Sequence, residues 1–340
     1  MVLYMILNKI IGIFLCFLTL FFIIKNKKKT QTIQLQGKTM GTYWQVKIPN
    51  TKIKNIKYIK KLIQKNLDAD EQLLSPWKKK SLVYQFNQLK KYKLLKINKK
   101  FLKIILTALT MHKKTNGKLD ITIGTLINLW GFGTEKKPHH YPLINTIKKN
   151  INLTGIHNLK IINNSHGIYL KKNINGMKIN LSTLGEGFAV DHLSCILKKK
   201  GIKNYTISIG GTVLVNNKTK IIAIQKPTDK KRSIQLLVNL NNKSISTAGT
   251  YLNYYFLHSK NVSHIIDPEK GTPIKNNLVS VSVISSTALE ADSWDTALLL
   301  LGVKKAKKLS INENLAVCLI IKEKNKFLTW ISPQFKKFLI

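Results

Sequence analysis

Asp292 and Thr296 lie four residues apart in a stretch whose pattern is helical. This spacing places a carboxylate and a hydroxyl on one face of a helix, close to its start. Oxygen ligands of this kind suit a hard cation such as Mg²⁺. An acidic side chain in a first helical turn can also serve only to complement the helix dipole, so the spacing alone leaves both interpretations open.

The elements that would position this pair are marked in the flanking sequence. Residues 279–285 alternate apolar and hydroxyl side chains, which predicts a half-buried strand. Thr287 and Glu290 then form a capping box, in which the Thr hydroxyl accepts from a first-turn N–H and the Glu reaches back. We expect the helix to end at Gly302, a suitable residue for the position after the last helical turn.

Two further segments carry polar groups in an apolar setting. His264 and Asp267 lie in a turn that Pro268 makes rigid, just before the predicted strand. Asp120 follows an Asn-Gly turn and precedes two glycine-flanked aromatic residues, within the apolar stretch 119–124. Asp120 is therefore either a paired structural acid or a contact to a ligand.

Glycine-bearing turns recur along the chain. Residues 181–191 predict a glycine-bearing turn that opens a helix ending at Gly201, and free N–H groups at such a helix start favour phosphate. A GxG motif is weak support, because tight turns use it widely. Residues 205–211 predict a strand ending in a glycine pair, and residues 246–251 a further glycine turn. None of these matches a P-loop or a Rossmann fingerprint.

The N-terminal half begins with simpler elements. Residues 44–48 alternate so that Trp44, Val46 and Ile48 face one side of a strand. Residues 53–74 have helical apolar spacing, and the helix ends at Ser75.

The chain has 340 residues, enough for one large or two smaller domains, and a net charge of +42. The basic residues are lysines apart from Arg232, and they are spread among abundant Asn and Ile. Nucleic-acid readers favour the bidentate fork of arginine. We therefore interpret the charge as solvated surface rather than a nucleic-acid footprint, with weak attraction to anionic lipid as a side effect.

The first 25 residues are mostly apolar and approach the length that spans a bilayer. We interpret residues 1–25 as a membrane anchor or signal segment, residues 26–36 as a linker and residues 37–340 as the folded domain. Cys16 lacks the small residues before it that a lipoprotein signal would have. Cys195 and Cys318 have no metal-binding spacing, and a disulfide between them stays open.

Taken in order, these segments resemble the ApbE family, the FAD:protein FMN transferases. The resemblance runs from about residue 35 to the C-terminus. It is carried by KTMGTYWQV, DITIGTLINLWGFG, LSTLGEGFAVDHL, NYTISIGG, ISTAGTY, HIIDPEKGTPI, LVSVSVISSTALEADSWDTALLLLG and the tail LTWISPQFKKFL.

The resemblance implies a single α+β domain, with mixed or antiparallel sheets flanked by helices, that binds FAD as substrate together with Mg²⁺. It implies transfer of FMN to a Thr or Ser hydroxyl of an acceptor protein, with release of AMP. The carbonyl of Gly185, with Asp292 and Thr296, should hold the metal, and His264 is the candidate base. Residues expected along FAD are Met40, Trp77, Leu119, Asp120, Ile121, Thr122, Ser182, Glu186, Phe188 and Ile266.

The resemblance also implies acceptors among flavoprotein subunits of membrane electron-transport complexes, of the Rnf or sodium-translocating NADH:quinone reductase type. It places the domain on the periplasmic side of a bacterial inner membrane. The sequence departs from the common family pattern at Asn180, Thr250 and Leu252. Two alternatives therefore stay open: an FAD pyrophosphatase that yields FMN and AMP, and a non-catalytic FAD-binding protein.

Overall fold

The computed structural model describes residues 32–49, 55–228, 233–251, 253–324 and 326–340. Its centre is an eight-stranded sheet in which neighbouring strands pair antiparallel, in the order β1-β2-β6-β7-β10-β15-β16-β17. In sheet order the strands are β1 (Thr32–Thr39), β2 (Thr42–Pro49), β6 (Tyr205–Ile209), β7 (Thr212–Asn216), β10 (Lys243–Gly249), β15 (Leu278–Ser285), β16 (Ala316–Glu323) and β17 (Lys326–Ile331).

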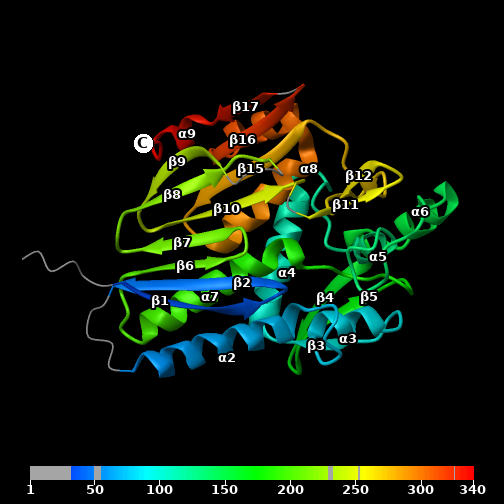
Figure 1. The fold of residues 1–340 in the computed structure, drawn as a ribbon. Helices are drawn as coiled ribbons and strands as arrows, with labels where there is room; N and C mark the ends of the chain where they lie inside the picture. The colour runs from blue at the N-terminus through cyan, green and yellow to red at the C-terminus, as the bar shows by residue number, and fades with distance from the viewer. Residues whose placement is uncertain (1–31, 50–54, 229–232, 252, 325) are drawn as a thin grey trace, which may run out of the picture.

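Long helices cover one side of this sheet. Helices α7 (Ser182–Lys199) and α8 (Ala288–Asn312) lie behind the sheet in the view of Figure 1, and α2 (Ile56–Leu74) runs along its β1–β2 end. Alternation in β2 directs Trp44, Val46 and Ile48 into the core, where each is at most 1% exposed. Replacing a buried Trp of this kind with Ala costs about 3–5 kcal/mol.

Smaller elements surround the second half of the core. They are α3 (Leu82–Gln88), α4 (Lys99–Lys114), α5 (Gly124–Leu129), α6 (Ile144–Ile151), η1 (Ile156–Asn158) and α9 (Pro333–Lys336), with the small sheets β3 (Leu95–Ile97), β5 (Gly167–Lys172) and β4 (Leu159–Asn164); β8 (Lys220–Gln225) and β9 (Ile234–Leu240); β11 (Tyr254–Leu257) and β12 (Lys260–Ser263); and β13 (Ile266–Asp267) and β14 (Thr272–Pro273). The α+β architecture expected from the sequence is confirmed.

Three expectations about element boundaries need correction. Residues 32–36, expected in the linker, belong to β1 and pair with β2. Gly185 and Gly187 lie inside α7 rather than in a turn before it. Gly302 has φ +71° and breaks the helical backbone, but a second helical segment follows at once, so α8 extends to Asn312 with a kink.

The capping box at α8 is only half correct. The Thr287 hydroxyl accepts from the Glu290 N–H at 3.2 Å, as expected. The Glu290 carboxylate instead accepts from the Ser285 and Ser286 hydroxyls. The carboxylate of Asp191, on α7, accepts from the N–H groups of Ala288 and Leu289 at 2.8 and 3.0 Å. The first turn of α8 is thus capped by a side chain from α7, while the Glu290 carboxylate makes no capping bond there.

The expected membrane segment, residues 1–25, lies outside the described residues. Within the part of the chain that the structure describes, no helix is long and apolar enough to cross a bilayer. Cys195 and Cys318 are both free thiols, so the disulfide that the sequence left open does not form.

Candidate active site

Three acidic side chains from α7 and α8 gather at the contact between the two helices. The backbone N–H of Gly187 donates to Asp292 Oδ2 at 2.8 Å, and the Ser246 hydroxyl donates to Asp292 Oδ1 at 3.4 Å. Gly187 allows this approach, because a Cβ there would lie 2.4 Å from the Ala288 carbonyl oxygen. The cluster therefore depends on a glycine in the middle of α7.

Glu186 on α7 joins the cluster, and its carboxylate is held by the turn between β6 and β7. Its Oε2 accepts from the Gly211 N–H at 2.9 Å. Gly210 has φ +51°, and a Cβ on it would lie 2.0 Å from Glu186 Oε1. The glycine pair that ends the predicted strand at residues 205–211 thus holds the Glu186 carboxylate: Gly211 donates to it, and Gly210 leaves space for it.

The ionised forms of these three carboxyl groups are unfavourable when no cation is beside them. Burial, with the charges of Asp295 and Glu186, raises the pKa of Asp292 well above its ordinary value of 3.8. Burial raises the pKa of Asp295 to about 8 and that of Glu186 to about 7. A divalent cation beside the cluster would favour the ionised forms, since opposite charges lower a carboxyl pKa.

The donor set fits a hard cation in part. Among the described residues, no group of three or more His, Cys, Asp or Glu side chains is arranged to hold a metal ion. A metal site here would need other oxygens, such as the partly exposed Thr296 hydroxyl, which donates to Asp295 Oδ1 at 3.1 Å. Mg²⁺ commonly takes one or two carboxylates and completes its shell with substrate phosphate and water. Asp292 and Thr296 suit that pattern.

Gly185 lies two residues before Gly187, the hydrogen-bond partner of Asp292, and is buried. A Cβ on Gly185 would lie 3.8 Å from Met40 Sδ and 3.7 Å from Leu74 Cδ1. The β1–β2 turn that carries Met40 therefore packs against the expected metal-binding backbone of α7.

Asp120 accepts two hydrogen bonds, from the N–H and the hydroxyl of Thr122, at 2.7 and 2.6 Å. The Thr122 hydroxyl in turn accepts from the Gly155 N–H at 2.7 Å. These bonds use Oδ1 of Asp120 and give it a structural role in fixing the turn before α5, while its contact with a ligand stays a prediction. Asp120 Oδ2 is left to face His112 at 3.9 Å.

This turn is tied to the start of α7. The N–H of Asn180 donates to the Ile121 carbonyl at 2.8 Å, and the Asn180 side chain accepts from the Ser182 N–H at 2.9 Å. An aspartate at position 180 would make the same acceptor contact. The departure at Asn180 therefore preserves the turn that opens α7.

His264 has one defined tautomer in this environment. Its Nδ1 lies 2.8 Å from the Asn253 carbonyl oxygen, which can only accept, so Nδ1 carries the proton and Nε2 is free to act as a base. Burial lowers the pKa of His264, opposed by this hydrogen bond. The imidazole also meets the ring of Phe132 edge-on, with 6.2 Å between centroids.

The remaining expected residues fall into two groups. Leu119, Ile121, Phe188 and Ile266 are buried, whereas Ser182 is exposed and the Trp77 ring is 57% exposed. His264 makes its contacts with Asn253 and Phe132 rather than with the acidic cluster. Thr250 donates its N–H to the Val279 carbonyl, and Leu252 lies outside the described residues.

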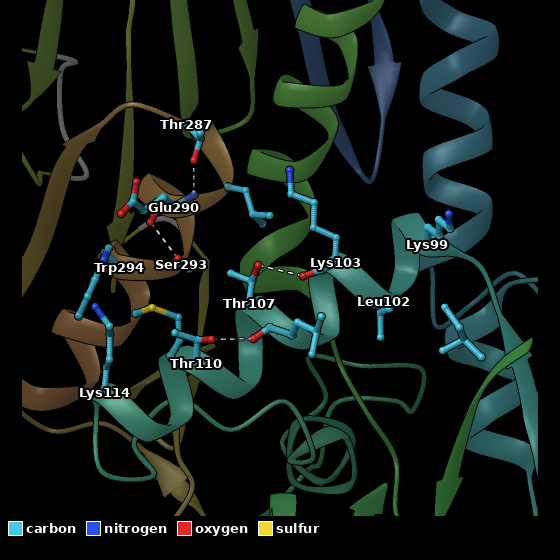
Figure 2. A pocket seen from close by; sticks show the side chains of 14 residues that line it. Lys99, Leu102, Lys103, Thr107, Thr110, Lys114, Thr287, Glu290, Ser293 and Trp294 are labelled. Atoms are coloured by element: carbon cyan, nitrogen blue, oxygen red, sulfur yellow. Dashed lines mark hydrogen bonds between the residues drawn. The ribbon is translucent and has the colours of Figure 1, made fainter. Parts of the chain in front are cut away.

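A pocket of about 680 Å³ lies elsewhere, between α4 and the first turns of α8 (Figure 2). Thr287, Glu290, Ser293 and Trp294 line it from α8. Helical spacing turns Asp292, Asp295 and Thr296 to the other side of α8. None of the expected site residues lines this pocket.

Comparison with known proteins decides the family. A sequence model described as the ApbE family matches residues 40–319. The chain belongs to the ApbE family. It is 65% identical over 340 residues to an FAD:protein FMN transferase of Buchnera aphidicola subsp. Schizaphis graminum, covering 99% of each chain. It is 45% identical over 316 residues to the Escherichia coli (strain K12) protein of that name, covering 92% of this chain and 90% of the relative.

Solved ApbE structures share the fold. The flavin transferase ApbE from Vibrio cholerae superposes with a TM-score of 0.83 at 30% identity, covering 91% of this chain and 99% of that one. The apo form of the Pseudomonas stutzeri flavinyl transferase ApbE gives a TM-score of 0.80 at 26% identity, covering 91% and 97%. This ApbE-family chain is thus a transferase.

The sequence interpretation missed two residues of the acidic cluster at the contact between α7 and α8. Asp295 follows Asp292 by three positions and so lies on the same side of α8, a spacing that was visible in the sequence. Ser246, which contacts Asp292, comes from β10 and is 46 residues away in the chain. Sequence spacing holds no signal for that contact.

Proposed function

We propose that this protein carries out Mg²⁺-dependent transfer of FMN from FAD to a Thr or Ser hydroxyl of an acceptor protein, with release of AMP. The observation that carries the proposal is the cluster of buried Asp292 and Asp295 with the partly buried Glu186, whose carboxyl pKa values are raised when no cation is beside them. Membership of a family of flavin transferases supports the reaction class.

The metal would be held by the Gly185 carbonyl, Asp292 and Thr296, with Asp295 beside them. When bound, Mg²⁺ supplies neutralisation of pyrophosphate charge, so that an oxygen nucleophile can approach the phosphorus. Glu186 and Asp295 lie beside the proposed metal position, where a positive charge would favour their ionised forms.

In the proposed reaction the acceptor hydroxyl oxygen bonds to the phosphorus of the FMN half. The bond from that phosphorus to the bridging oxygen breaks, and AMP leaves. His264 receives the hydroxyl proton at Nε2, because the Asn253 carbonyl holds the proton on Nδ1. Burial favours the neutral imidazole that this step requires.

The binding role of the other residues is part of the proposal. The side chains proposed to contact FAD are those of Met40, Trp77, Leu119, Asp120, Ile121, Thr122, Ser182, Glu186, Phe188 and Ile266. Burial of most of them suits an apolar site with few polar groups. The exposed Trp77 would gain a partner only when a ring stacks on it.

The acceptors are proposed to be flavoprotein subunits of membrane electron-transport complexes of the Rnf or sodium-translocating NADH:quinone reductase type. The apolar run in residues 1–25 supports anchoring in a bacterial inner membrane. With such an anchor, the domain would act on the periplasmic side.

The test uses the full chain with FAD, Mg²⁺ and a candidate acceptor domain that carries a flavinylation Thr. The mass and in-gel flavin fluorescence of the acceptor are followed. We expect an FMN-sized mass gain that disappears with EDTA and with a Thr→Ala acceptor. Free FMN and AMP without labelled acceptor would indicate a pyrophosphatase, and bound FAD without turnover would indicate a flavin-binding protein; either result contradicts the proposal.

A further inference from the structure

Two exposed segments flank His264 and are joined to each other by aromatic contacts. The ring of Phe132 lies 5.2 Å from that of Tyr255 on β11 and 6.2 Å from that of His264. The Tyr255 hydroxyl donates to the Trp130 carbonyl at 3.0 Å. The β11–β12 hairpin and the segment after α5 therefore form one flank beside the candidate base.

The outer parts of these segments also meet. His140 Nδ1 lies 3.3 Å from Nε2 of His258, at the tip of the hairpin. The ring of Tyr141 meets that of Trp130 edge-on, with 6.0 Å between centroids. His140 is thus held against the hairpin and Tyr141 against Trp130, shortly before α6, which lies on the right of the molecule with the hairpin in Figure 1.

This flank exposes large apolar side chains. Phe256 on β11 is 65% exposed, and Leu143 and Ile144 at the start of α6 are 75% and 70% exposed. Several large exposed apolar side chains gathered on one surface can mark an interaction site, whereas a single one needs no explanation. Together the three residues form what we call the flank patch.

The charges around the flank patch are almost all positive. Residues 131–149 and 253–263 contain five lysines and a single acid, Glu135. Glu135 is already paired with Lys178 at 3.2 Å. Lys136, Lys137 and Lys260 are exposed. A partner seated here would gain from apolar side chains and from a net negative charge.

We infer that the flank patch docks the acceptor protein, through an acceptor surface that presents apolar side chains among acidic ones. This inference rests on the proposed function, because an acceptor hydroxyl that reaches His264 must bring the body of its protein over these elements. The patch then holds the acceptor while the site holds FAD. The two substrates are thereby recognised by separate surfaces.

The test compares two variants of the full chain in steady-state FMN transfer to a periplasmic acceptor domain of an Rnf-type complex. The patch variant carries Phe256→Ser, Leu143→Ser and Ile144→Ser. The control carries Ile221→Ser and Ile234→Ser, at positions 62% and 61% exposed on β8 and β9, on the other side of the molecule. FAD binding is measured separately by flavin fluorescence.

We expect the patch variant to raise the KM for the acceptor at least about 10-fold, as loss of an interface anchor does, with affinity for FAD and kcat at saturating acceptor unchanged. The control should match the unaltered enzyme. Changing Lys136, Lys137 and Lys260 to Glu should raise the same KM and weaken its salt dependence.

An unchanged KM for the acceptor in the patch variant, or an equal rise in the control, overturns the docking inference and leaves the proposed function intact. Loss of FAD binding in the patch variant also overturns it, since the flank would then serve FAD. Absence of transfer by the unaltered enzyme contradicts the proposed function itself.

Discussion

Glu186 on α7 meets Asp292 and Asp295 on α8 where the two helices pack together. The two aspartates are buried and Glu186 is partly buried. Their raised pKa values follow from burial and, for Asp292 and Asp295, also from neighbouring acidic charge; a bound cation would lower these pKa values. His264 is different, because burial alone opposes its charged form. At the scale of single residues, the environment of the three acids favours a proton or a cation beside each carboxylate, and the environment of His264 favours the neutral imidazole.

The pH dependence of transfer should reflect His264. Since the base must be neutral, kcat/KM at saturating Mg²⁺ should rise with pH through a pKa below 6.5 and level off above it. His264→Gln should lower the rate by about 10²–10⁴ and remove that limb. A pH profile of both proteins checks this. A limb above pH 7 in the unaltered enzyme would assign the base to another group.

Gly210 should tolerate no side chain. Its φ of +51° and the 2.0 Å approach of a Cβ to Glu186 Oε1 predict that Gly210→Ala destabilises the fold by about 1–3 kcal/mol. Urea unfolding measures the loss. Gly201→Ala, at φ +74° with open space around it, controls for backbone strain alone. Equal losses in the two variants would remove the contact with Glu186 from the argument.

At the scale of elements, the N-terminal half of α7 packs against the first turns of α8. Gly187 lets them approach, and Asp191 caps the first turn of α8 from the neighbouring helix. The α8 N-terminus, and with it Asp292 and Thr296, is therefore placed by α7. The face of α8 that is proposed to hold the metal and the Asp191 cap of that helix therefore depend on the same contact with α7.

Asp191→Asn should show this dependence. The amide keeps the size but loses one carboxylate acceptor and the charge, so we expect a loss of about 1 kcal/mol in the free energy of unfolding. The KM for Mg²⁺ should rise as well, because α8 is less firmly placed. Thr287→Ala removes the cap that α8 makes for itself and is the matched comparison. Unaltered stability of Asp191→Asn would contradict the shared role.

Sequence patterns foresaw the local parts of this arrangement. The alternation of residues 279–285 and the cap at Thr287 gave the positions of β15 and of the start of α8 correctly, because both depend on neighbours in the chain. The expected half-burial of the strand was wrong, since Ser280 and Ser282 are buried as well. The Asp191 cap crosses 97 residues, and the Ser246 contact crosses 46. Contacts of that reach are set by how helices pack, so periodicity cannot predict them.

At the scale of the whole molecule, an antiparallel sheet lies against two helices whose contact holds the acids, and the β11–β12 hairpin leads into His264, the proposed base (Figure 1). The resemblance to one family over most of the chain predicted this architecture. The resemblance could not place the acceptor, because nothing in a single sequence says which exposed surface another protein covers.

Mg²⁺ should stabilise the folded protein in a pH-dependent way. Glu186 and Asp295 have folded pKa values of about 7 and 8, above their ordinary values, so their protonation stabilises the fold below about pH 4 and this contribution is lost as pH rises to 8. Mg²⁺ replaces those protons. Thermal unfolding in EDTA and in Mg²⁺ should therefore differ more at pH 8 than at pH 5.5. A Mg²⁺ effect that shrinks with rising pH would contradict this.

The most direct measurement compares FMN transfer by the unaltered protein and by Asp292→Ala over a range of limiting Mg²⁺ concentrations, with acceptor mass and AMP release followed together. Because Asp292 is a buried acid of α8 that accepts from the Gly187 N–H on α7, its loss should lower the rate at least ~10²-fold, as removal of a central electrostatic stabiliser does. Full transfer by Asp292→Ala at limiting Mg²⁺ would contradict the metal site at its centre.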